Sequence, residues 1–97
     1  MLFIVLTTDK ADSAQVRSGN RPEHLAYLES FGKQIVAGGA TLTDDGAGMT
    51  GSFLLVDMAD RAAVEAFAAG DPFAKAGLFE KTEIRRWRKV IFNPPQD

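Results

Sequence analysis

Two stretches of the chain are apolar on both sides of an extended backbone, and they limit the possible folds more than any other feature. Residues 2–8 read LFIVLTT, and residues 51–56 read GSFLLV. Side chains alternate between the two faces of a sheet, so both stretches predict strands that are covered on both faces. Burial of one Leu or Phe side chain contributes about 1.5–3 kcal/mol, which disfavours any fold that leaves one of these faces in water.

A helix is predicted between these two strands. Asn20 is the expected N-cap, Glu23 stands at the capping-box position, and Pro22 fits the first turn, where its missing N–H costs nothing. Gly32 supplies a stop signal. The polar residues 12–19 fit either a helical turn or a loop. The apolar stripe of the helix has the spacing i, i+3, i+4, i+7 and consists of His24, Tyr27, Leu28 and Phe31.

The remaining elements complete the order βαββαβ. They are a strand over 34–37 that ends at Gly38-Gly39, the strand over 51–56, a helix over 61–69 capped by Asp60, a short helix that starts at Pro72, and a last strand over 82–92. This order predicts an α+β, ferredoxin-like fold, in which an antiparallel sheet carries both helices on one face. We expect residues 1–97 to form a single domain, with 93–97 as a flexible tail.

The apolar side chains on the second face of such a sheet must also be shielded from water. With 97 residues there is no second domain to cover them. Another copy of the chain is the simplest cover, so we expect a homodimer that packs sheet against sheet.

Composition and charge exclude several classes of function. The net charge of −2 gives no electrostatic footprint for nucleic acid or an anionic membrane. RNA recognition modules share the order βαββαβ, but the third strand here offers one Phe among aliphatic residues. No apolar segment approaches the roughly 20 residues that span a bilayer, and the N-terminus lacks the features of a signal peptide. We therefore expect a cytoplasmic protein.

Metal and cofactor motifs are missing from the sequence. One histidine and no cysteine argue against a zinc site. No glycine-rich loop has the spacing of a phosphate-binding or dinucleotide-binding motif. Asp44 and Asp45 before Gly46 fit a turn better than a calcium loop. We expect no cofactor and no metal.

His24 and Asp71 are the candidate catalytic residues. A buried imidazole must find a hydrogen-bond partner or line a cavity, so His24 is either a structural histidine bonded to a backbone carbonyl or part of a site. Asp71 precedes Pro72 and fits the N-cap of the short helix. A carboxylate has two oxygens, so one can cap the helix while the other accepts from an imidazole. Both residues fall on the helix-bearing side of the sheet, where they can meet.

The chain resembles the YciI-like family, the YCII-related domain, over nearly its whole length. The resemblance is carried by RPEHLAYL at 21–28, AGG at 37–39, TGS at 50–52 and DPFAKAGLFE at 71–80, followed by a last strand with a Trp. It implies a ferredoxin-like dimer of the dimeric α/β-barrel type with a His–Asp pair in a pocket. On this chain it implies His24 and Asp71 as the pair, and as pocket lining Arg21, Gly39, Ser52 and Phe73.

A His–Asp pair supports proton transfer, because the carboxylate orients the ring and stabilises its protonated form. Ser52 would complete a triad, but a Ser at the start of a strand more often bonds to backbone. The family includes a dehydrochlorinase, and the resemblance therefore implies a small cofactor-independent enzyme that eliminates from or isomerises a small organic acid or lactone. Arg21 would bind a substrate carboxylate. The alternatives are a non-catalytic ligand-binding or accessory module, and a haem protein with His24 as axial ligand.

A basic cluster surrounds Trp87 in the predicted last strand. It consists of Arg85, Arg86, Arg88 and Lys89. On an edge strand such charges prevent edge-to-edge pairing, and the other interpretations are an anion site or ion pairs across a dimer.

Overall fold

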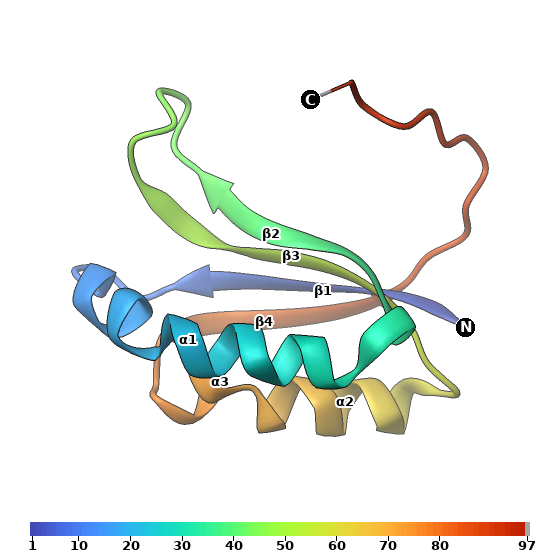
Figure 1. The fold of residues 1–97 in the computed structure, drawn as a ribbon, viewed down its shortest axis with the longest axis horizontal. Coiled ribbons are helices and arrows are strands. Elements are labelled where there is room, and N and C mark those ends of the chain that lie inside the picture. The colour runs from blue at the N-terminus through green and yellow to red at the C-terminus, as the bar shows by residue number, and fades with distance from the viewer. Residues whose placement is uncertain (97) are drawn as a thin grey trace.

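The computed structural model describes residues 1–96, which form one four-stranded sheet with the helices on a single face (Figure 1). The elements in chain order are β1 (Leu2–Asp9), α1 (Ala14–Ser30), a 3-10 turn (Gly32–Gln34), β2 (Ile35–Leu42), β3 (Met49–Asp57), α2 (Arg61–Gly70), α3 (Pro72–Lys75) and β4 (Phe79–Arg86). The predicted α+β class and the order βαββαβ, with a short extra helix before the last strand, are confirmed.

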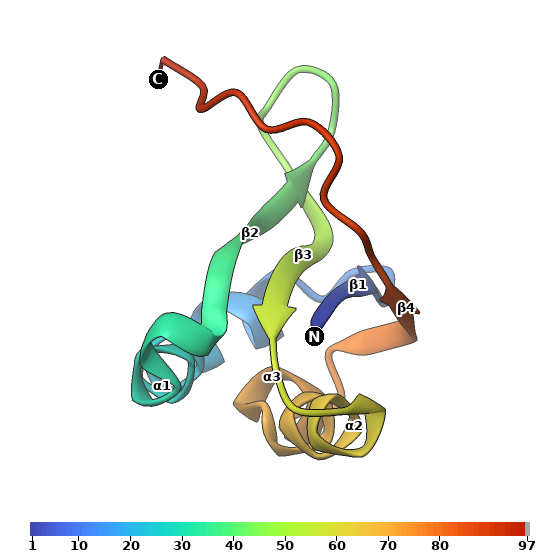
Figure 2. The ribbon, with the colours of Figure 1, turned by 90° about the vertical axis from the view of Figure 1, so that its right-hand side faces the viewer.

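The strands lie in the order β2-β3-β1-β4, and every neighbouring pair is antiparallel. The two doubly apolar strands, β1 and β3, are the central ones, as predicted. In the register, Val5 stands between Leu54 of β3 and Ile84 of β4. Figure 2 looks along the sheet and shows α1 and α2 below it, with nothing above the strands except the hairpin and the C-terminal segment.

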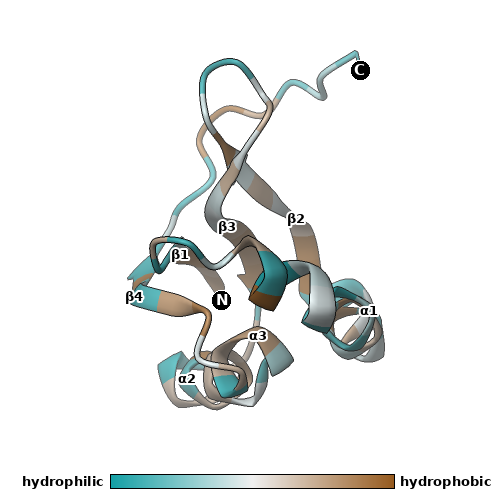
Figure 3. Ribbon diagram, turned by 90° about the vertical axis from the view of Figure 1, so that its left-hand side faces the viewer, coloured by the Kyte–Doolittle hydropathy of each residue, from teal (hydrophilic) through white to brown (hydrophobic). Residues whose placement is uncertain are grey.

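The core lies between the sheet and the helices. Its buried members are Phe3, Val5, Leu54, Val56, Met58, Val64 and Phe67. The opposite face of the sheet carries the alternating residues of the same strands, among them Leu6 and Phe53, which pair with each other and are 38% and 39% exposed. Figure 3 shows hydrophobic colours along the strands and hydrophilic colours at the tip of the β2–β3 hairpin. The sequence therefore places apolar side chains on both faces, and the helices of this chain cover one of them.

The predicted start of α1 is wrong. The helix begins at Ala14, so Asn20 is not its N-cap; the Asn20 side chain instead donates to the carbonyl of Val16 at 2.8 Å. Pro22 lies inside the helix, where it lacks an N–H to donate to the preceding turn. Tertiary contacts outweigh this local cost, because Arg17 in the first turn is bonded to both central strands.

The ends of β2 and β4 differ most from the prediction, and β3 and β4 begin earlier than predicted, at Met49 rather than residue 51 and at Phe79 rather than residue 82. β2 continues through Gly38-Gly39 to Leu42, because β3 remains alongside as a pairing partner. A Cβ atom at position 38 would collide with the side chain of Leu54, so glycine here allows close packing rather than ending the strand.

β4 ends at Arg86 rather than at residue 92, because its neighbour β1 begins at Leu2 and offers no further backbone. The Trp87 amide makes a last bond to the Leu2 carbonyl at 3.1 Å. Of the basic cluster, Arg85 and Arg86 are therefore exposed residues of an edge strand, as predicted, whereas Arg88 and Lys89 lie outside it. Position 97 of the predicted tail lies outside the described residues.

The capping predictions for α2 and α3 are confirmed. Asp60 accepts from the amide of Ala63 at 2.8 Å, and Asp71 accepts from the amide of Phe73 at 2.9 Å. The Asp44-Asp45 segment is a turn, in which Asp45 accepts from the Thr43 hydroxyl at 2.6 Å. That bond and one from the Ala47 amide lower the pKa of Asp45. Within residues 1–96 no helix has the length and apolar character to cross a membrane.

Candidate active site

The structure brings His24 and Asp71 into direct contact. His24 lies in α1 and Asp71 in the junction between α2 and α3, and the distance from His24 Nδ1 to Asp71 Oδ1 is 2.7 Å. Both residues are buried, with 7% and 4% of their surface exposed. The same Oδ1 atom also accepts from the amide of Phe73. The prediction that the two oxygens of Asp71 divide these roles is therefore wrong, because one oxygen performs both.

The contact between α1 and α2 fixes the positions of His24 and Asp71 relative to each other. The Tyr27 hydroxyl donates to the carbonyl of Phe67 at 2.8 Å. Gly70 allows this approach, since a Cβ atom there would collide with the Tyr27 hydroxyl. Burial of the hydroxyl, together with the negative charge of Asp71, raises the pKa of Tyr27.

Phe73 fixes the orientation of the imidazole. Its ring is stacked on that of His24, with the centroids 3.9 Å apart and the planes at 11°. Phe73 is itself held by the first turn of α3 and is 1% exposed. Because Nδ1 of His24 is bonded to Asp71, Nε2 is the ring nitrogen that remains for a ligand.

A cavity of about 250 Å³ opens beside this pair, between α1 and the strands β2 and β3. All four residues predicted to line the pocket lie on its wall, with His24. They are Arg21, Gly39, Ser52 and Phe73. Asp71 does not line the cavity and contributes through His24. Gly39 pairs with Phe53 in the sheet, and a Cβ atom there would meet no atom within 4 Å.

Sequence reasoning missed Arg17, which lines the same cavity. Its Nε and Nη2 atoms donate to the two oxygens of Asp9 at 2.8 and 3.0 Å. Nη2 also lies 3.0 Å from the Gly51 carbonyl and 3.1 Å from Ser52 Oγ. Arg17 and His24 are seven positions apart and so lie on one side of α1, a spacing that could have drawn attention to Arg17 if the helix had been extended to residue 14.

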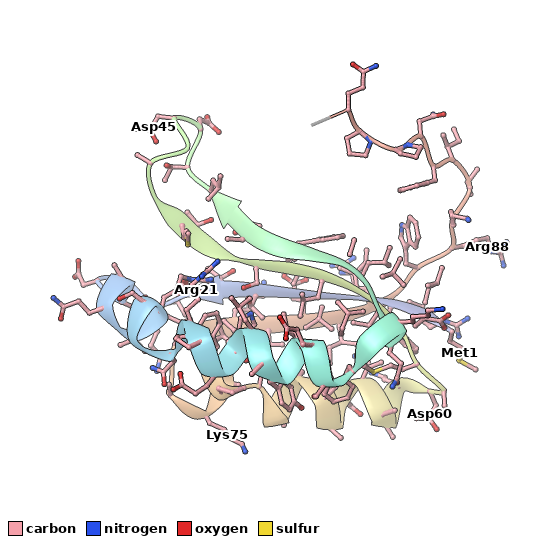
Figure 4. All side chains as sticks on the ribbon, viewed as in Figure 1. Met1, Arg21, Asp45, Asp60, Lys75 and Arg88 are labelled. Carbon is pink, nitrogen blue, oxygen red and sulfur yellow. The ribbon has the colours of Figure 1, made fainter. Side chains whose placement is uncertain are left out.

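Ser52 and Arg21 line the cavity, but neither is hydrogen-bonded to His24 within residues 1–96. Ser52 accepts its hydrogen bond from Arg17, and within residues 1–96 none joins it to His24, so a Ser–His triad is not assembled. Arg21 is exposed, and Figure 4 shows its side chain extending from α1 on the side of the strands.

A second, larger cavity of about 600 Å³ adjoins the first and shares Arg17, Arg21 and Met49 with it. It lies between the β1–α1 connection and the β2–β3 hairpin and does not include His24. The smaller cavity is the candidate site because it is lined by His24, one partner of the buried His24–Asp71 pair. Among residues 1–96, His, Asp and Glu side chains form no cluster of three or more that could hold a metal ion.

Comparison with known proteins identifies the family. The model of the YCII-related domain matches residues 1–88. The chain belongs to the YCII-related domain family. Protein YciI of Escherichia coli O6:H1 is 34% identical over 94% of this chain and all of its own length, and YciI of Shigella flexneri gives the same values. A relative from Haemophilus influenzae is 27% identical over the same shares.

Among solved structures, one enzyme is similar to this chain in both fold and sequence. This is the 5-chloro-2-hydroxyhydroquinone dehydrochlorinase TftG from Burkholderia phenoliruptrix, solved in complex with 2,5-dihydroxybenzoquinone. The TM-score is 0.86 and the identity 42%, and the match covers 93% of this chain and 96% of TftG. The family expected from the sequence motifs is therefore confirmed.

Proposed function

We propose that this YCII-related protein is a cofactor-independent cytoplasmic enzyme in which His24 transfers a proton during elimination from, or isomerisation of, a small organic acid or lactone. The observation that carries the proposal is the 2.7 Å contact between His24 Nδ1 and Asp71 Oδ1 behind a cavity that leaves Nε2 free. An imidazole fixed in this way is a general base whose second nitrogen can also return the proton.

In the proposed reaction, Asp71 selects the tautomer with the proton on Nδ1 and stabilises the imidazolium that forms when Nε2 accepts a proton. The stacked Phe73 ring restrains the imidazole of His24, which lines the cavity. In an elimination, the electron pair of the broken bond to hydrogen forms a double bond and the leaving group departs with its own pair. In an isomerisation, the imidazolium returns the proton to a second atom of the substrate. Arg21 supplies a positive charge for a substrate carboxylate.

The likeness to TftG supports an elimination in particular. A dehydrochlorinase removes a proton and a chloride from one molecule, which needs a base and no redox partner. At 42% identity over nearly the full chain, a shared class of reaction is a reasonable proposal. The single planar ring of a chlorinated hydroxyhydroquinone is small enough for the cavity of about 250 Å³ beside Phe73.

We propose further that the enzyme is a homodimer that buries the open face of the sheet. Leu6 and Phe53 stand side by side on this face. Ile91 and Phe92 are 77% and 65% exposed in the segment that follows β4. Covering these residues would stabilise a dimer, because apolar area removed from water contributes roughly 25 cal/mol per Å². Sedimentation equilibrium tests this: a protein that stays monomeric at micromolar concentration contradicts it.

The test of the catalytic proposal uses 5-chloro-2-hydroxyhydroquinone and follows chloride release. We expect turnover by the wild-type protein and a loss of about 10²- to 10⁴-fold in kcat for His24→Gln. Glu29→Gln is the matched control, because Glu29 is an exposed residue of the same helix and does not line the cavity.

Binding of 2,5-dihydroxybenzoquinone, measured by calorimetry, separates catalysis from ligand binding. The proposal expects His24→Gln to bind this quinone while failing to release chloride. A wild-type protein that binds the quinone but turns over no chlorinated hydroxyhydroquinone, lactone or hydroxy acid would instead be a ligand-binding module.

A further inference from the structure

The cavity beside His24 is continuous with the larger cavity of about 600 Å³ at the end of the sheet. Arg17, Arg21 and Met49 line both, so the two cavities meet at these three side chains. Figure 1 shows the β1–α1 connection and the β2–β3 hairpin, which bound the larger cavity, at the same end of the molecule. A molecule bound beside His24 can therefore extend past Arg21 and still contact the protein.

The two cavities differ in the size of ligand that they can hold. Pockets that enclose a drug-sized ligand measure about 300–1,000 Å³. The smaller cavity, at about 250 Å³, lies below this range, and the larger one lies within it. A ligand confined to the neighbourhood of His24 is thus limited to a small unit such as a single ring, whereas a longer ligand needs the larger cavity as well.

Small side chains keep the larger cavity open. Its wall includes Ala11, Ala14, Ala47, Gly48 and Met49, and most of the surface that lines it is apolar. Within residues 1–96 no aromatic ring contributes to this wall. Met49 is 54% exposed, so an apolar side chain at the boundary of the two cavities is left in water. Such a surface favours an apolar group, which would release the water in contact with it.

The charges on the wall of the larger cavity do not select a second charged group. Arg17 is paired with Asp9. Lys10 and Asp12 are both exposed and are opposite in sign. We therefore expect the part of a ligand that lies in this cavity to be uncharged.

Arg21 stands where the two cavities meet and has its charge available. It is exposed and takes part in none of the ion pairs formed among residues 1–96. Figure 4 shows its side chain on the side of the strands. A guanidinium binds a carboxylate through two parallel N–H bonds. A carboxylate held here would lie between a unit that reacts at His24 and a remainder in the larger cavity.

We propose that the larger cavity binds an apolar substituent of the substrate, so that the substrate is an organic acid that extends past Arg21 from the part that reacts at His24. This inference rests on the proposed function for the reacting part alone. The substituent takes no part in the proton transfer. Its binding helps to hold the reacting unit in position beside His24.

Phenylacetate and 2-phenylvalerate test the proposal at equilibrium, without turnover. Both acids carry a ring and a carboxylate, and the second adds a propyl group on the carbon next to the carboxylate. We expect calorimetry to show about 10- to 50-fold tighter binding of 2-phenylvalerate by the wild-type protein, because each methylene group that leaves water contributes about three- to fourfold. Equal affinities, which would also result if a second copy of the chain covered the cavity, overturn the proposal, as does a protein that binds neither acid.

Ala14→Leu fills part of the larger cavity. Ala14 is exposed, lines this cavity and does not line the smaller one. The variant should lose about 10-fold of the affinity for 2-phenylvalerate and keep the affinity for phenylacetate. Ala62→Leu is the matched control, because Ala62 is an exposed residue in the first turn of α2 and lines neither cavity. The same affinity for 2-phenylvalerate in both variants contradicts the proposal.

Amide resonances in an NMR spectrum locate the two parts of the ligand. Phenylacetate should shift Gly39, which lines only the smaller cavity, and 2-phenylvalerate should also shift Ala47, which lines only the larger one. A bound 2-phenylvalerate that leaves Ala47 unshifted overturns the proposal.

His24→Gln separates this proposal from the proposed function. The variant should keep the preference for the longer acid, because the propyl group does not contact His24. If it also kept full turnover in the chloride-release assay, proton transfer by His24 would be wrong while the role of the larger cavity would stand. Lost turnover in His24→Gln, together with a wild-type protein that shows no preference for the longer acid, would give the reverse result.

Discussion

The imidazole of His24 and the ring of Phe73 lie nearly parallel, at 11°, with their centroids 3.9 Å apart. Asp71 holds both, because its Oδ1 atom accepts from His24 Nδ1 and from the Phe73 amide. One carboxylate oxygen therefore sets the position of the ring and of the surface on which the ring rests. The contact connects residues 47 positions apart and makes the cap of α3 part of the candidate site.

Phe73→Leu should disturb His24 more than it disturbs the fold. Leucine fills most of the volume, so we expect a loss of about 1–2 kcal/mol in the free energy of unfolding. Loss of the aromatic ring should move the His24 proton resonances in an NMR spectrum, which can be assigned directly because the chain has one histidine. Phe31→Leu is the control, since Phe31 packs on Tyr27 and Phe67; equal shifts in both variants would contradict the stacking.

Asp9→Asn should destabilise the protein strongly. The substitution leaves the buried guanidinium of Arg17 without its counter-charge, and breaking a buried pair in this way costs about 3–5 kcal/mol. Asp57→Asn is the matched comparison, because Asp57 pairs with the N-terminal ammonium in a contact that is 50% and 58% exposed. That change should cost less than about 1 kcal/mol. Urea unfolding measures both, and equal losses would show that the Arg17–Asp9 pair is not a buried anchor.

Gly51→Ala should separate the two central strands. A Cβ atom at this position would collide with the backbone carbonyl of Thr7, which cannot move without breaking the pairing of β1 and β3. We expect a loss of about 1–3 kcal/mol in thermal or urea unfolding. Gly39→Ala should change stability by less than about 1 kcal/mol, because a Cβ atom there meets nothing within 4 Å. A Gly51→Ala protein as stable as Gly39→Ala would mean that the strands are further apart than described.

Tyr27→Phe should lower stability at neutral pH by about 0.5–1.5 kcal/mol, because the bond to the Phe67 carbonyl is lost. The pKa of Tyr27 is raised from its ordinary value of 10.0, so the folded state holds this proton more tightly than the unfolded state. The contribution is complete below 10.0 and is lost as the pH rises through the folded-state pKa. The stability difference between the wild type and Tyr27→Phe should therefore shrink in alkaline solution; a difference that stays constant or grows contradicts the burial of the hydroxyl.

The sequence correctly predicted those features that depend on residues close together in the chain. The caps at Asp60 and Asp71 depend on residues two or three positions away, and both were read correctly. The start of α1 was misread because Pro22 and Asn20 look like a helix start. What extends the helix to Ala14 is the bonding of Arg17 to Gly51 and Ser52, which are 34 and 35 positions away. Single-sequence patterns do not contain this information.

In the candidate site, too, one part could be predicted from the sequence and another part could not. The meeting of His24 with Asp71 was expected from the order of elements and from the family motifs, because both helices had to lie on one face. Arg17 was missed because it fell in a segment that fitted either a helical turn or a loop. The continuation of β2 past Gly38 was missed for a related reason: glycine was taken as a stop, whereas here it admits the side chain of Leu54.

Proton transfer by His24 requires that Nε2, and not Nδ1, is the unprotonated nitrogen of the neutral ring, and nitrogen-15 NMR of the single histidine tests this directly. Asp71 should hold the proton on Nδ1, so the neutral ring should show a protonated Nδ1 and an unprotonated Nε2, and Asp71→Asn should change this balance. A ring with its proton on Nε2, or one whose nitrogens exchange freely as in a solvated imidazole, would contradict the proposed base.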